Sequence, residues 1–111
     1  NKQQLVEEFH KEELSRLPLD EQTFQIVREG MREAVVSGTA KLLNDLPVEA
    51  AAKTGTAEVG VKGKGFNSLF VAYAPYDNPE IAIAIVIENI GKTQGLAILT
   101  AKNFLSWYFQ R

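Results

Sequence analysis

The four residues from Lys53 to Thr56, Lys-Thr-Gly-Thr, are the part of the chain whose side chains could best do chemistry. Lys53 carries a point charge on a flexible stem, which suits an anionic group of a substrate. Thr54 and Thr56 each offer a hydroxyl that donates and accepts hydrogen bonds. Gly55 has no Cβ, so another molecule can lie close against the backbone there. Together they could hold a carboxylate and a developing oxyanion, for which one backbone N–H donor is typically worth about 10²–10³ in rate.

The tripeptide Lys-Thr-Gly alone does not establish such a site. In ordinary composition it occurs by chance in roughly one chain in forty of this length. It is also the third signature of the penicillin-recognising serine enzymes, whose other two signatures are Ser-x-x-Lys and a Ser-x-Asn-type element. The flanking sequence therefore decides between a binding strand and an ordinary strand that ends in a turn.

Five segments of the chain follow one another in a specific order and spacing. They are VREGMREAVV (27–36), GTA (38–40), AKTGTA (52–57), FNSLFVAYAP (66–75) and PEIAIAIVIE (79–88). From about residue 20 onward the chain resembles the C-terminal part of the transpeptidase domain of class B penicillin-binding proteins, particularly the elongation type similar to penicillin-binding protein 2. Ala52 stands where the family often has glycine, and Leu69 stands at a position that is commonly tryptophan.

The resemblance implies acyl transfer in a parent protein, a peptidoglycan D,D-transpeptidase that cross-links cell wall. A serine attacks the D-alanyl-D-alanine peptide bond and releases the terminal D-alanine, and the acyl group then passes from the serine to an amine of a neighbouring stem peptide. In this chain Lys53 would supply positive potential, and the Thr54 and Thr56 hydroxyls would bind the carboxylate of the substrate or of a β-lactam. The backbone N–H of Thr56 would form half of the oxyanion hole, and Gly55 would let the substrate approach.

The nucleophile that this reaction needs is not in the sequence. None of the four serines, Ser15, Ser37, Ser68 and Ser106, is followed by lysine three residues later, and no Ser-x-Asn occurs. We therefore interpret residues 1–111 as a C-terminal fragment of a transpeptidase domain whose N-terminal part carries the nucleophile. The chain alone should be inactive, because a catalytic unit without its nucleophile loses most of its rate.

Two other functions remain open at this point. One is a fragment of a β-lactamase or β-lactam sensor from the same superfamily, and the other is a non-catalytic α+β interaction module. The GTA segment and the Ala-Tyr-Ala-Pro strand end favour the transpeptidase. A Ser-x-x-Lys upstream in the parent chain would distinguish it from the interaction module.

Composition limits the possible partners and cofactors. The net charge of −2 and the absence of a basic cluster argue against nucleic acid. No cysteine and a single histidine, His10, leave no thiolate or His-based zinc site, and we expect neither metal nor cofactor. The expected partners are the peptidoglycan stem peptide, β-lactams and the missing N-terminal part of the domain. A meander without its neighbours would also expose an edge and an apolar face, which predicts self-association.

The resemblance also implies a location in the bacterial cell envelope. The family is anchored in the cytoplasmic membrane by an N-terminal helix, with this domain on the outer side. The longest apolar run of the chain, residues 81–87, is far shorter than the roughly 18 residues of a membrane span. We therefore expect any anchor to lie in the longer parent protein.

The elements that must position residues 53–56 are predicted from periodicity. Residues 19–37 should form a helix that Asp20 caps, with one apolar face; that face comprises Phe24, Val27, Met31, Ala34 and Val35. Residues 48–88 should hold three strands, roughly 50–59, 66–74 and 80–88, and the third should be buried on both faces. Residues 93–109 should form a helix whose apolar stripe packs on the sheet; the stripe comprises Ala97, Ala101, Phe104 and Tyr108. Residues 1–18 have no clear assignment.

These elements make an α+β fold, an antiparallel three-stranded meander with an N-terminal and a C-terminal helix, as in a fragment of the penicillin-binding/β-lactamase-like transpeptidase fold. Alternation along the first strand places Lys53 and Gly55 on one face and Thr54 and Thr56 on the other. Both pairs can serve one site only if this strand lies at an edge of the sheet, with the substrate along it.

Overall fold

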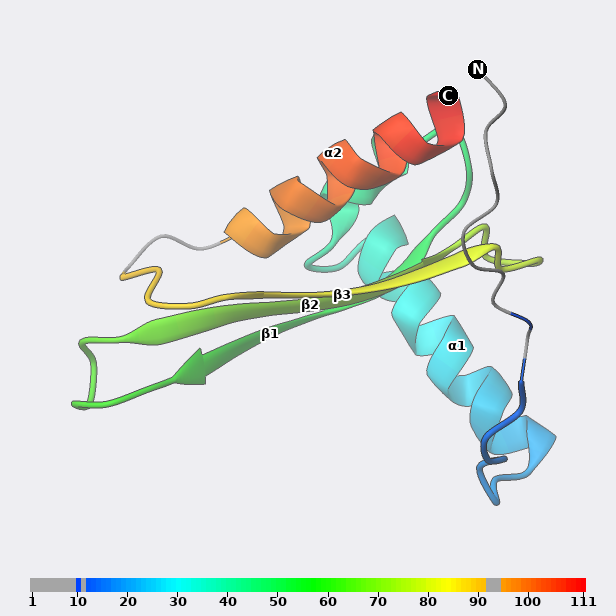
Figure 1. Cartoon of the computed structure of the whole chain (residues 1–111), viewed down its shortest axis with the longest axis horizontal. Helices are drawn as coiled ribbons and strands as arrows, with labels where there is room; N and C mark the ends of the chain where they lie inside the picture. The colour runs from blue at the N-terminus through cyan, green and yellow to red at the C-terminus, as the bar shows by residue number, and fades with distance from the viewer. Residues whose placement is uncertain (1–9, 11, 92–94) are drawn as a thin grey trace.

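The computed structural model describes residues 10, 12–91 and 95–111. In chain order its elements are α1 (Glu21–Val36), the 3-10 helix η1 (Lys41–Asp45), β1 (Ala51–Glu58), β2 (Phe66–Ala74), β3 (Ile81–Ile87) and α2 (Leu96–Gln110). The strands form one antiparallel sheet in the order β1-β2-β3. Figure 1 shows α2 along one face of this sheet and most of α1 on the other side. The predicted α+β meander with a helix before and after it is confirmed.

The register of the sheet assigns each strand residue to one of two faces. Thr54 pairs with Phe70, which pairs with Ile85, and paired residues point to the same side. The face toward α2 therefore carries Thr54 and Thr56, the even-numbered residues of β2, and the four isoleucines of β3. The opposite face carries Lys53, Gly55, Leu69, Val71 and Tyr73, together with Ala82, Ala84 and Val86.

The hydrophobic core lies between the sheet and α2. Phe70 is its largest fully buried side chain, and Leu43 of η1 and Leu105 of α2 are also fully buried. The 3-10 helix η1, which the sequence did not predict, closes one end of this core and is tied to α2 by an ion pair of 2.5 Å between Asp45 and Lys102. The core thus fixes β2 and, through β2, the strand β1 that pairs with it.

The third strand is buried on one face only, so the prediction of burial on both faces was wrong. The isoleucines of β3 are half-buried against α2, whereas Ala82, Ala84 and Val86 are exposed. The reason is that α2 covers one side of β3, and no described element of the chain covers the other side there. A continuous apolar run cannot by itself reveal which of its faces finds a partner.

Helix α1 begins as predicted, because the Asp20 side chain accepts a hydrogen bond of 2.7 Å from the Thr23 N–H. This bond stabilises the carboxylate and lowers the pKa of Asp20. The helix ends at Val36 with Ser37 as its cap. The predicted apolar face is only partly buried: Val35 is inaccessible to solvent, but Val27 is 54% exposed. Only the C-terminal end of α1 reaches the core.

Helix α2 buries the predicted stripe in part, with Leu105 in place of Phe104. Ala97, Ala101 and Leu105 are fully buried, at steps of four residues, while Phe104 is 40% and Trp107 60% exposed. The prediction that Phe104 packs on the sheet was therefore wrong; its ring lies at the surface, with its centroid 5.8 Å from that of Trp107 and the two rings tilted by 44°. The predicted helix start at residue 93 lies outside the described residues, as do residues 1–9 and 11 of the unassigned segment. Residues 12–20 form neither helix nor strand, and His10 is exposed.

Replacing Gly30 of α1 and Gly38 of the turn after it by alanine should change the free energy of unfolding in opposite directions. A Cβ on Gly38 would lie 2.8 Å from the Cα of Ala34, so Gly38→Ala must displace backbone, at an expected cost of about 1–3 kcal/mol in the free energy of unfolding. A Cβ on Gly30 would meet nothing within 4 Å, so Gly30→Ala should raise the free energy of unfolding by about 0.5–1 kcal/mol. Urea unfolding of both variants measures this, and equal effects would contradict the packing at Gly38.

Candidate functional site

The Lys-Thr-Gly-Thr residues lie in the middle of β1, at the edge of the described sheet. Strand β1 pairs with β2 on one side, and no strand among the described residues pairs with its other side. The side chains alternate as the sequence predicts, with Thr54 and Thr56 on the face toward α2 and Lys53 and Gly55 on the opposite face. The predicted edge position is therefore present in the described part of the chain.

The backbone of β1 sends the main-chain groups of both threonines to the unpaired edge. The N–H of Val59 donates to the carbonyl of Gly65 at 2.9 Å, across the β1–β2 pair. Main-chain groups of successive strand residues point alternately to the two sides, so the odd-numbered residues of β1 face β2. The N–H and C=O groups of Thr54 and Thr56 consequently face outward. Such a row of unpaired groups can pair with an extended ligand.

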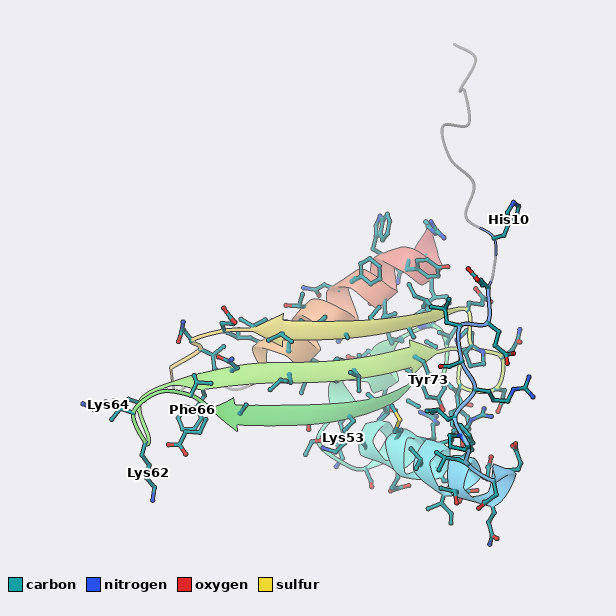
Figure 2. The ribbon with its side chains drawn as sticks, turned by 60° about the horizontal axis from the view of Figure 1, so that its bottom comes forward. His10, Lys53, Lys62, Lys64, Phe66 and Tyr73 are labelled. Carbon is teal, nitrogen blue, oxygen red and sulfur yellow. The ribbon has the colours of Figure 1, made fainter. Side chains whose placement is uncertain are left out.

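The ammonium group of Lys53 also reaches this edge. Its Nζ donates a hydrogen bond of 2.5 Å to the carbonyl oxygen of Thr54, which points outward. The Lys53 side chain is exposed, and Figure 2 shows it on the outer side of β1, far from Lys62 and Lys64 at the tip of the β1–β2 hairpin. The lysine therefore leaves the strand on one face but brings its charge beside the outward-facing groups of the threonines.

Gly55 is not required by packing inside the chain. A Cβ there would lie 3.4 Å from the Cβ of Leu69, at the near end of ordinary van der Waals contact, and the backbone is not in the left-handed region. The chain itself would accept alanine at this position with little adjustment. What the glycine provides is an uncovered stretch of backbone between two outward-facing threonines, as a closely approaching ligand needs.

A hollow of about 440 Å³ opens on the α2 side of the four residues. Its lining includes the hydroxyl-bearing residues Thr39, Thr54, Thr56 and Ser68, with Gly95 and Ile98 from the start of α2. Thr39 and Ser68 were not predicted as site residues. Thr39 lies in the GTA segment, but only the fold brings it to Thr54, where the two hydroxyl oxygens are 2.8 Å apart. Ser68 is opposite Thr56 in the register and is 6% exposed.

Two arginines of α1 fix the start of β1. Arg32 donates to the carbonyl oxygen of Ala50 at 3.1 Å and pairs with the carboxylate of Glu49. Arg28 donates to the carbonyl oxygen of Tyr76 at 2.9 Å, and the N–H of Tyr76 donates to the carbonyl of Glu49 at 2.8 Å. The neighbouring Tyr73 side chain raises the pKa of Arg28. This arrangement, which we call the arginine clamp, occupies the edge at Ala50 and leaves it open from Thr54.

The four serines are dispersed, and two of them have evident structural surroundings. Ser37 caps α1 and its hydroxyl bonds the Glu33 carboxylate. Ser68 lies inside the sheet–helix layer. Ser15 lies outside helix and strand, and Ser106 lies on α2. Within the described ranges, no group of three His, Cys, Asp or Glu residues could hold a metal ion.

Comparison with known proteins adds an independent line of evidence. Residues 2–105 match the family model described as the penicillin binding protein transpeptidase domain. The chain is 37% identical over 95 residues to the peptidoglycan D,D-transpeptidase MrdA of Acinetobacter baumannii, an alignment that covers 74% of this chain and 14% of that protein. It is 31% identical over 113 residues to penicillin-binding protein 2B of Streptococcus pneumoniae, covering 94% of this chain and 16% of the relative.

Solved structures agree with these sequence matches. Penicillin-binding protein 2B of S. pneumoniae superimposes with a TM-score of 0.81 and 28% identity, over 96% of this chain and 18% of that one. Penicillin-binding protein A of M. tuberculosis, solved as an imipenem acyl-enzyme complex, gives a TM-score of 0.70 and 29% identity, over 86% and 21%. This chain therefore corresponds to less than a quarter of each of these proteins.

The alternation of main-chain directions along β1 predicts alternating hydrogen exchange. The amides of Gly55 and Ala57 face β2 and should be protected, while those of Thr54 and Thr56 face outward and should exchange at least about tenfold faster. Residue-resolved hydrogen–deuterium exchange by NMR measures this difference. Uniform protection across residues 54–57 would mean that another segment or a second chain pairs with this edge.

Proposed function

The chain belongs to the penicillin-binding protein transpeptidase family, and on that premise we propose that it supplies the substrate-binding strand of a peptidoglycan D,D-transpeptidase. The observation that carries this proposal is the edge of β1, where two outward-facing backbone positions, two hydroxyls and one ammonium group meet within four residues. The similarity to a peptidoglycan D,D-transpeptidase and to a penicillin-binding protein supports this function over a β-lactamase or a non-catalytic module.

In the proposed reaction the chain binds and polarises the substrate rather than attacking it. A serine oxygen from another part of the domain loses its proton and forms a bond to the carbonyl carbon of the penultimate D-alanine, and the bond to the terminal D-alanine nitrogen breaks as that nitrogen gains a proton. The N–H of Thr56 donates to the oxygen of that carbonyl as negative charge develops on it. Its outward direction and the bare backbone at Gly55 support this assignment.

The carboxylate of the leaving D-alanine is the proposed ligand of the two hydroxyls. Thr54 and Thr56 share one face of β1 and line the same hollow, which is open to an extended ligand lying along the edge. Lys53 contributes positive potential beside them, since its ammonium lies at the outward carbonyl of Thr54. A β-lactam carboxylate can occupy the same position; the solved M. tuberculosis relative is an imipenem acyl-enzyme.

We further propose that this sequence is the C-terminal part of a longer transpeptidase domain. The chain spans 14% and 16% of the length of the curated relatives described above, and Ser-x-x-Lys is absent from its 111 residues. In the longer protein the domain would act on the outer side of the cytoplasmic membrane, in the bacterial cell envelope, anchored by a segment outside this sequence. Among the described residues, no helix is long and apolar enough to cross a membrane.

Intact-mass measurement after incubation with a reactive penicillin tests this proposal. The full-length protein should gain one covalent adduct, and this chain alone should gain none. In the full-length protein Lys53→Ala should slow acylation by at least about a hundredfold, because a preorganised charge is removed at the site. Lys62→Ala is the matched control, since Lys62 is exposed at the hairpin tip and should leave the rate unchanged.

The possible outcomes separate the competing functions. An adduct on the isolated chain would mean that one of its own serines is a nucleophile. No adduct on either protein would favour the non-catalytic interaction module. Unchanged acylation of Lys53→Ala, with an unchanged melting temperature, would remove Lys53 from the site while leaving the family membership intact.

The isolated chain is also proposed to associate with itself. The sheet face opposite α2 exposes Leu69, Val71 and Val86 beside the unpaired edge of β1. Exposed apolar area next to an open strand edge favours pairing between chains. Light scattering of the isolated chain should give a mass above that of a monomer, and Val71→Lys should shift it toward the monomer by placing a charge on this face. A monodisperse monomer at tens of micromolar would contradict this expectation.

A further inference from the structure

We propose that Thr39 is a positioning residue for Thr54: its hydroxyl donates to the Thr54 hydroxyl and so directs the Thr54 proton toward the bound carboxylate. The two oxygens are 2.8 Å apart, and both residues line the hollow beside the edge of β1. The inference rests on the proposed function, because it assumes that Thr54 binds a carboxylate. Thr39 itself need not touch the ligand.

The backbone around Thr39 is held on both sides. The N–H of Gly38 donates to the carbonyl of Glu33 at 3.1 Å, and the N–H of Ala40 donates to the carbonyl of Ala34 at 2.8 Å. Gly38 packs so closely on Ala34 that no Cβ fits, and Ala40 is fully buried. Thr39 is therefore an exposed side chain on a turn that the end of α1 fixes in place. A residue that orients another group needs such a fixed backbone.

The chemistry of a hydroxyl explains why its direction matters. A threonine hydroxyl has one proton to donate and two lone pairs. A carboxylate only accepts, so Thr54 can bind it only through its proton. If Thr39 donates to Thr54, one lone pair of Thr54 is occupied and its proton remains available for the ligand. Two hydroxyls in series also polarise each other, which strengthens the outer hydrogen bond.

This arrangement makes a specific prediction for the carboxylate of the ligand. Replacing Thr39 by valine keeps the shape of the side chain but removes the donor. The acylation of full-length protein by a penicillin with a free carboxylate should then slow by about fivefold to tenfold, since a hydrogen bond to a charged group is weakened. The slower acylation should come from a larger dissociation constant of the non-covalent complex that precedes acylation, and the maximal acylation rate should be unchanged. When the carboxylate of the same penicillin is esterified, the acylation rate of Thr39→Val should equal that of the unsubstituted protein.

Three further variants distinguish positioning from a general structural effect. Thr39→Ser keeps the hydroxyl and should retain the rate within about twofold, because the donor is still present. Thr54→Val should slow the free acid by itself, and adding Thr39→Val to it should cause no further loss, since coupled residues are not additive. Melting temperatures of all variants establish that each is folded.

The outcomes separate this inference from the proposed function. If Thr54→Val slows the free acid and Thr39→Val does not, Thr39 is not a positioning residue and the proposed function stands. If Thr39→Val slows the acid and the ester equally, or still slows the acid in the Thr54→Val background, its role is structural and the inference fails. If Thr54→Val itself has no effect on the free acid, the carboxylate assignment fails and the inference with it.

Discussion

The proposed function places two demands on the edge of β1, which must be unpaired at Thr54 and Thr56 and yet held in place, and the described structure meets both. A strand gains stability from neighbours on both sides, but a second neighbour would occupy the main-chain groups that a ligand needs. In the structure, the contacts that hold β1 lie away from the unpaired edge at Thr54 and Thr56. Strand β2 holds one side of β1, the core under α2 holds β2, and the arginine clamp holds the start of β1 at Ala50.

Helix α1 connects the two sides of this arrangement. Its middle carries Arg28 and Arg32, which bind carbonyl oxygens at the beginning of β1 and after β2. Its end buries Val35 in the core and leads into the tight turn that presents Thr39 to Thr54. Helix α1 therefore carries the arginines that occupy the edge of β1 at Ala50, and it also leads into the turn that places Thr39 beside the Thr54 hydroxyl. Although its predicted apolar face is only partly buried, α1 thus still contacts the strand that carries the candidate site.

The sequence predicted the local features well and the three-dimensional neighbours less well. Asp20 as the cap of α1 and the bounds of β2 were predicted from capping, alternation and turn residues, which are local signals, whereas the edge position of β1 was expected from the family resemblance. The burial of β3 and the exposure of Phe104 were not, because both depend on which face another element covers. Thr39 was missed for the same reason, since 14 residues, among them the 3-10 helix η1, lie between it and Thr54 in the sequence.

The outward N–H groups of β1 belong to the main chain, which has a consequence for how the site can vary. A side-chain donor disappears with one substitution, but the donors at positions 54 and 56 survive every replacement except proline. Sequence drift can thus change the hydroxyls and the charge along this edge without erasing its pattern of donors. The direction in which these donors point can then change only through displacement of the strand, and the residues able to cause it are those that hold β1, such as Arg32 at its start.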